Sequence, residues 1–180
     1  MRAKSICAIA ALVSVAGAAQ GSFIDSDPHN DTPAGAHFLG NFVDGDSDVL
    51  MAALMPHDID WFKIYVGDDS SGFLTTITFP LTDPRYAPDT VLGVFDESMA
   101  MVNHNNDANG AGSAVRVDNI EPGIYYLAVT GLGDDDWNGL GHIEHGMYAL
   151  TLSYVEVPTP GSLALAGLGG GVLAVRRRRR

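Results

Sequence analysis

Cysteine is almost absent from this 180-residue sequence. The single cysteine, Cys7, lies in an N-terminal segment with the features of a cleaved export signal. Without it, the mature chain has no thiol nucleophile, no thiolate metal ligand and no disulfide. Its stability must therefore come from a hydrophobic core or from bound metal.

Basic residues are equally scarce in the body of the chain. Of ten basic residues, two open the chain and five close it, which leaves Lys63, Arg85 and Arg116 between them. All 22 acidic residues fall in that middle part, so the body carries a formal charge of −19. This charge argues against nucleic acid and anionic lipid as partners of the folded part, and it favours cations.

The motifs of hydrolytic enzymes are missing as well. There is no G-x-S-x-G element. No pair of aspartate or glutamate residues has sequence surroundings that would give its two carboxyl groups different pKa values, as an acid–base pair requires. Asp58 and Asp60 open a strand pattern, where we expect turn formers and edge charges. His142, Glu144 and His145 fit neither the HExxH nor the HxxEH zinc spacing and are expected to be polar loop residues. A small secreted hydrolase is therefore the least favoured function.

The N-terminus has the three parts of an export signal. A short basic region is followed by an apolar run over residues 6–15 and then by the small residues Gly17, Ala18 and Ala19, which suit signal peptidase. This N-terminal segment contains no twin-arginine pair, which favours general secretion of an unfolded chain. We predict a signal peptide over residues 1–19 and a single folded domain over residues 22–156.

The C-terminus combines a proline-containing linker, a short apolar run and an arginine cluster. The apolar run over residues 163–175 would span about 20 Å as a helix, against a hydrocarbon core of about 30 Å. Arginine clusters stay on the cytoplasmic side, so an exported chain would stall with its acidic domain outside. An ordinary C-terminal membrane anchor remains an alternative, although the span is short for one.

This layout, over residues 157–180, resembles the PEP-CTERM sorting signal. Thr159 stands where the family's short motif has glutamate. The resemblance implies an exosortase-like processing enzyme as partner, a membrane-embedded, cysteine-protease-like protein that removes the tail after transient insertion in the inner membrane. It also implies release or transfer of the protein at the cell surface. The residues of the sorting signal are Pro158, Thr159, Pro160, Gly161, Arg176, Arg177, Arg178, Arg179 and Arg180.

Between the two end signals, apolar residues alternate with period two and show no helical periodicity. Phe62, Ile64 and Val66, for example, fall on one face of residues 61–66. Glycine, proline, asparagine and aspartate separate the strand segments. About eight short strands predict an all-β, antiparallel sandwich. The other predicted strands cover residues 37–43, 49–55, 73–79, 90–95, 114–117, 124–130 and 148–155.

The order of short motifs over residues 30–154 resembles the bacterial pre-peptidase C-terminal domain. The resemblance implies a jelly-roll-like β-sandwich, in a family usually attached to secreted peptidases, with some relatives that bind calcium or matrix polymers such as collagen. The loop over residues 131–146 is longer than the family pattern predicts. The motifs are Asn30-Asp31-Thr32, Asp58-Ile59-Asp60-Trp61-Phe62, Asp89-Thr90-Val91-Leu92, Asn105-Asn106-Asp107, the segment 122–129 and the segment 146–152.

Acidic clusters in loops make calcium the expected cofactor. A hard cation needs about six to eight oxygen ligands gathered from loops, and a divalent ion would relieve repulsion among the carboxylates. For any one cluster, the alternative is a solvated acidic surface. The first cluster, Asp44, Asp46 and Asp48, has the alternate spacing that begins an EF-hand loop. Val49 and Met55, however, stand where that motif has glycine and glutamate, so an EF-hand is excluded. The candidate calcium ligands are Asp44, Asp46, Asp48, Asp134, Asp135 and Asp136.

Trp137 and Asn138 follow the second cluster and are candidate ligand-binding residues. An exposed tryptophan in a glycine-rich loop could stack on a sugar or polymer. It could equally fold back over the end of the core.

We therefore expect a non-enzymatic exported surface or extracellular-matrix protein. The alternative is a calcium-dependent binding module for an extracellular polysaccharide or protein, with residues 134–137 as the contact.

Overall fold

The computed structural model describes residues 21–23, 30–67, 71–83, 87–108 and 110–157. The predicted signal peptide and the sorting-signal residues 158–180 lie outside these ranges. Within them, no helix is long and apolar enough to cross a membrane.

The described chain is all-β, as predicted. Besides a single 3-10 turn, η1 (Pro33–Gly35), it consists of strands joined by loops. The strands are β1 (Gly21–Phe23), β2 (His37–Phe42), β3 (Ser47–Leu54), β4 (Asp60–Val66), β5 (Gly72–Pro80), β6 (Thr90–Asp96), β7 (Met101–Asn105), β8 (Ala114–Ile120), β9 (Gly123–Gly131) and β10 (Gly146–Glu156). All eight predicted strands are present, and β1 and β7 are additional.

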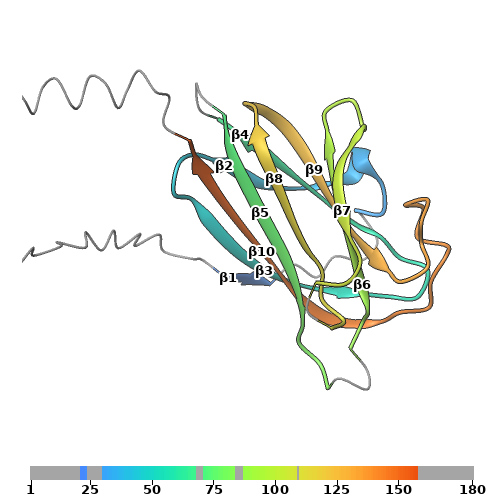
Figure 1. Ribbon diagram of the computed structural model, residues 1–180. Coiled ribbons are helices and arrows are strands. Elements are labelled where there is room, and N and C mark those ends of the chain that lie inside the picture. The colour runs from blue at the N-terminus through green and yellow to red at the C-terminus, as the bar shows by residue number, and fades with distance from the viewer. Residues whose placement is uncertain (1–20, 24–29, 68–70, 84–86, 109, 158–180) are drawn as a thin grey trace, which may run out of the picture.

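The strands form two sheets of five (Figure 1). The order is β1-β3-β10-β5-β8 in the first sheet and β2-β4-β9-β6-β7 in the second. The prediction of a purely antiparallel sandwich is wrong at one edge of each sheet, because β1 pairs with β3, and β2 with β4, in parallel. Neither β1 nor β2 pairs with a strand next to it in the chain, so no hairpin turn fixes its direction at that edge.

The core lies between the sheets and follows the alternation along each strand. In β4, Phe62, Ile64 and Val66 are fully buried, and Leu150, Leu152 and Tyr154 of β10 face them from the first sheet's side of the core. Burial of these side chains stabilises the fold by roughly 1.5–3 kcal/mol each.

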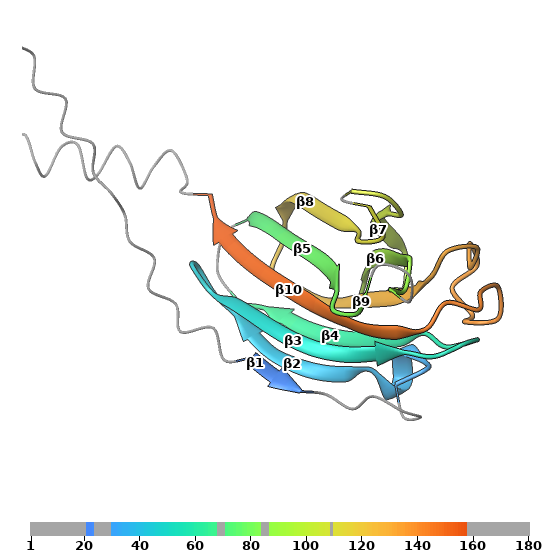
Figure 2. The same cartoon turned by 90° about the horizontal axis from the view of Figure 1, so that it is seen from below.

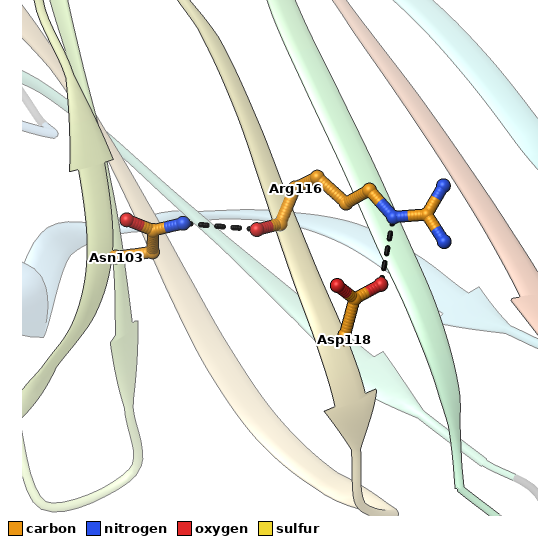
Figure 3. Close-up of polar contacts among 3 residues, drawn as sticks. All are labelled: Asn103, Arg116 and Asp118. Atoms are coloured by element: carbon orange, nitrogen blue, oxygen red, sulfur yellow. Dashed lines mark hydrogen bonds and ion pairs between the residues drawn. The ribbon is translucent and has the colours of Figure 1, made fainter.

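One lateral edge of the sandwich is closed by polar contacts between the sheets. The Thr78 and Thr90 hydroxyl oxygens, from β5 and β6, lie 2.6 Å apart in the interior. Asn103 of β7 donates its side-chain amide to the Arg116 carbonyl of β8 at 2.9 Å (Figure 3). These bonds connect strands that belong to different sheets.

The sandwich has two distinct ends (Figures 1 and 2). The loop over residues 131–146 lies at one end, next to the connection between β3 and β4, where the His57 amide donates to the His142 carbonyl at 3.3 Å. The β2–β3 turn lies at the other end, where the Gly45 amide donates to the Tyr154 carbonyl at 3.1 Å. We call these the loop end and the turn end.

Candidate functional site

The first predicted calcium cluster lies at the turn end, where its carboxylates hold the backbone. Asp46 accepts from the Val43 amide at 2.9 Å, and Asp44 accepts from the Glu156 amide at 2.9 Å. Asp48 accepts from its neighbouring amide at 2.8 Å. These bonds close the β2–β3 turn and attach it to the end of β10, a role typical of aspartates in turns.

The second predicted cluster lies at the loop end and is divided between the interior and the surface. Asp134 is buried, with 1% of its surface exposed. Its carboxylate accepts from the Thr130 hydroxyl at 2.7 Å and from the Gly139 and Asn138 amides at 2.9 and 3.3 Å. Burial raises the pKa of Asp134, but these hydrogen bonds outweigh it, so the pKa lies below its ordinary value. Asp134 therefore acts as an internal brace of the loop.

Asp135 and Asp136 are exposed beside a shallow hollow of about 430 Å³. The Asn138 side-chain amide donates to Asp136 at 2.7 Å. The hydrogen bond between Asp136 and Asp134 raises the pKa of Asp136. Asn138 thus helps to hold the loop with its backbone amide, which donates to Asp134, and with its side-chain amide, which donates to Asp136. The hollow is lined by Gly133, Asp135, Asp136, Asn138, Leu140 and Gly141.

The two clusters lie at opposite ends of the sandwich (Figures 1 and 2). In the part of the chain that the structure describes, no group of three or more histidine, cysteine or acidic side chains is placed to hold a metal ion. In the first triplet, the three carboxylates accept from different backbone amides. In the second, Asp134 is buried in the loop, whereas the exposed Asp136 accepts from the Asn138 side chain.

Trp137 folds back onto the second sheet. Its ring meets Phe95 edge-on at a centroid distance of 5.3 Å, and Phe95 in turn packs on Trp61 at 5.1 Å. A Cβ atom at Gly93 would lie 2.6 Å from the Trp137 ring, so the glycine provides the space for it. Of the two interpretations of Trp137, the structure supports a cover over this end of the sheet, with part of the ring still accessible.

The histidines of the loop do not converge on a metal. His142 is buried, and its Nε2 atom lies 2.7 Å from the Asp58 carbonyl, to which it donates. Glu144 accepts from the Asp89 amide at 3.1 Å. Burial, and then the charges of Asp107 and Glu144, raise the pKa of Asp89. These contacts attach the loop to the strands beneath it.

Sequence reasoning missed a buried carboxylate in the core. Asp60, expected as an edge charge, is fully buried. It accepts from the Tyr148 hydroxyl at 2.6 Å and from the Asn30 side-chain amide at 3.1 Å. Burial, and then the charge and hydrogen bond of Asp60, raise the pKa of Tyr148 well above its ordinary value. The bonds join β4 of the second sheet to β10 of the first.

The outer face of the second sheet carries a row of large side chains. Partners on neighbouring strands run in the order Phe38, Lys63, Tyr126, Phe95 and Met101. Because strands lie about 4.8 Å apart, the row crosses roughly 19 Å. Phe38 is 52% exposed, and the Lys63 ammonium lies 5.9 Å from the centre of its ring. Phe95 is only 5% exposed because Trp137 packs on it, so the exposed part of the row consists of the apolar side chains on either side of Phe95 and one cation.

Acidic side chains are placed away from the outer faces of both sheets. Among the described strands, Asp118 of β8 is the one acidic residue at an outward-facing position, and it pairs with Arg116 at 2.7 Å (Figure 3). Asp60 and Asp96 share the inward side of their strands with the core residues. The negative charge is therefore concentrated in the loops and at the strand ends. The outer faces carry few charged side chains, namely Lys63 on the second sheet and the Arg116–Asp118 pair on the first.

No protein-family model matches the sequence, and none of the curated proteins does. Solved structures with a similar fold include the pre-peptidase C-terminal domain of a collagenase from Bacillus anthracis, at 19% identity over 65% of this chain and 93% of that chain, with a TM-score of 0.47. They include PliG, a periplasmic inhibitor of g-type lysozyme from Aeromonas hydrophila, at 15% identity over 76% and 99%, with a TM-score of 0.42. A carbohydrate-binding module, CBM36, in complex with calcium and xylotriose has 13% identity over 57% and 77%, with a TM-score of 0.33. At these values, function has to be inferred from the chain's own residues.

Proposed function

We propose that this chain is a non-enzymatic, exported surface or extracellular-matrix protein. The observation that carries the proposal is the distribution of charge, in which acidic loops surround two sheet faces that carry few charged side chains. Acidic loops keep an exported protein soluble, and faces with few charges are available for contact. The buried carboxylates Asp60 and Asp134 accept hydrogen bonds that hold strands and loops together, which supports a structural rather than a catalytic role for them.

In this proposal, the C-terminal sorting signal directs the chain to the cell surface. The chain is exported, held briefly in the inner membrane by residues 163–175, and cut by an exosortase-like enzyme near Pro158-Thr159-Pro160. Two prolines so close together disfavour a continuing strand or helix, which keeps a cleavage site accessible.

We expect exported protein to end near residues 157–161. Intact mass spectrometry of material from the cell surface should show loss of the arginine cluster, because processing removes the segment that follows the linker. Replacing Pro158 and Pro160 with alanine should increase the unprocessed fraction. Full-length protein that ends in Arg180 and stays in the membrane would favour the plain membrane anchor.

A specific observation favours a second function, binding of an extracellular polysaccharide. Apart from Phe95, which Trp137 covers, the row from Phe38 to Met101 presents aromatic and apolar side chains on a face without carboxylates. Aromatic faces pack well on the C–H faces of sugar rings, and the charge of −19 on the body favours a neutral polymer over an acidic one. In this alternative, the contact is the part of the sheet face that Trp137 leaves uncovered.

Tyr126→Ala is expected to weaken binding to a neutral polysaccharide by about tenfold, from the loss of roughly 1.4 kcal/mol of packing. Affinity electrophoresis in gels that contain xylan, dextran or hydroxyethyl cellulose, with calcium and with chelator, measures the change. The matched control is Leu140→Ala, which removes a 69%-exposed side chain at the loop end. If Leu140→Ala weakens binding and Tyr126→Ala does not, the contact is the loop over residues 131–146.

A further inference from the structure

The outer face of the first sheet is apolar over three neighbouring strands. Met51, Ala149 and Phe79 form one cross-strand row, and Val49, Thr151 and Ile77 form the next. Met51 and Phe79 are 37% and 38% exposed, and Ala149 between them is buried by its neighbours. Small and β-branched side chains occupy the centre of this face.

The margin of this face along the edge strand β8 carries one positive and one negative side chain. Arg116 and Asp118 of the edge strand β8 form an ion pair at 2.7 Å, visible in Figure 3. The Arg116 guanidinium also lies 4.1 Å from the centre of the Phe73 ring on β5. Because the charges of Arg116 and Asp118 compensate each other, β8 adds no net charge to the outer face of the first sheet.

We propose that the chain forms a dimer in which this face packs against the same face of a second copy. A body with a formal charge of −19 repels its copies at most contacts, and this face allows close approach without bringing carboxylates together. The first-sheet face suits the contact better than the second-sheet face, which Trp137 partly covers. The inference is independent of polysaccharide binding.

The size of the face fits a stable dimer. Its three central strands have 8, 9 and 11 residues, so at about 3.4 Å per residue they extend roughly 27–37 Å. Four strands at about 4.8 Å cover roughly 19 Å, which gives a footprint on the order of 600 Å². Standard interfaces bury about 800 Å² of accessible surface per partner, and accessible area exceeds footprint. Two sheets can stack this way at about 10 Å, with a two-fold axis that keeps the contact closed.

Disulfide cross-linking of the full chain tests the proposal. With Cys7 replaced by serine, Thr151→Cys places one thiol at the centre of the face, beside its copy across the two-fold axis. Mild oxidation should link this variant on the order of tenfold faster than Tyr65→Cys, a matched control on the second sheet's outer face that is 42% exposed. Association through the terminal segments would link both variants equally and would overturn the proposal.

Sedimentation of the full chain gives an independent measurement. The wild-type chain should sediment as a dimer, and the dimer should strengthen as sodium chloride screens the repulsion between two acidic bodies. Ile77→Glu, an outward-facing substitution, should give a monomer, with circular dichroism to show that the fold is kept. If residues 163–175 cover the face of their own chain instead, the wild type stays monomeric, the thiol introduced by Thr151→Cys resists maleimide, and the dimer is excluded.

Discussion

Replacing Asp60 with alanine is expected to lower the free energy of unfolding by on the order of 3 kcal/mol. The substitution leaves the Tyr148 hydroxyl and the Asn30 amide without their acceptor in places where water does not reach, since 0% and 4% of these residues are exposed. For a domain of this size, the loss corresponds to a fall in Tm of roughly 10 °C. Urea denaturation followed by tryptophan fluorescence measures it.

Controls separate the buried hydrogen bonds from a general effect of removing negative charge. Asp135→Ala removes an exposed carboxylate and should change stability by less than about 0.5 kcal/mol. Asp60→Asn keeps one acceptor oxygen and should cost about half as much as Asp60→Ala. In a double-mutant cycle, Asp60→Ala and Tyr148→Phe should together cost about 1 kcal/mol less than the sum of the single losses. An Asp60→Ala variant as stable as wild type would show that these bonds contribute little.

The burial of Asp60 was already indicated by the pattern that predicted β4. Phe62, Ile64 and Val66 share the inward face, and Asp60 precedes them with the same parity. We expected an edge charge because a buried carboxylate needs donors, and nothing nearby in the sequence supplies the Tyr148 hydroxyl. The alternation predicts the position of the side chain, whereas its partner comes from a strand that the topology brings close.

Strand β7 could not be predicted because nothing requires its residues to alternate. It is an edge strand that pairs with β6 alone, and none of its residues is buried. Its polar side chains therefore resemble a loop, and Asn103 reveals its role only through the bond to Arg116. Strands such as β5, buried on one face, show period two clearly.

The orientation of Trp137 depends on space that another strand provides. The sequence allowed an exposed ring or a ring folded over the core, since both are compatible with a glycine-rich loop. The deciding residues are Gly93, which leaves room, and Phe95, which supplies an edge-on contact. Both lie on β6, so only the tertiary structure distinguishes the alternatives.

Replacing Asp134 with asparagine is expected to lower the free energy of unfolding by on the order of 2 kcal/mol at neutral pH. The charged carboxylate accepts bonds from Thr130, Gly139 and Asn138, and asparagine offers one acceptor oxygen without the charge. Because these bonds hold the loop over residues 131–146, the ring of Trp137 should become more exposed in the variant. A red shift of its fluorescence, measured with Trp61→Phe in both proteins, detects this.

The effect of Asp134→Asn should shrink in acid. The folded-state pKa of Asp134 is lowered, so its ionised form stabilises the fold above the unfolded-state value of about 3.9. That contribution disappears as the pH falls through the folded-state pKa, and the two stability curves should converge below about pH 4. Asp89 should show the opposite pH dependence, because burial and the charges of Asp107 and Glu144 raise its pKa. Its charged form opposes folding at neutral pH, so Asp89→Asn should remove a penalty there that is absent in acid. Parallel curves for Asp134→Asn and wild type from pH 7 to pH 3 would show that the charge of Asp134 does not brace the loop.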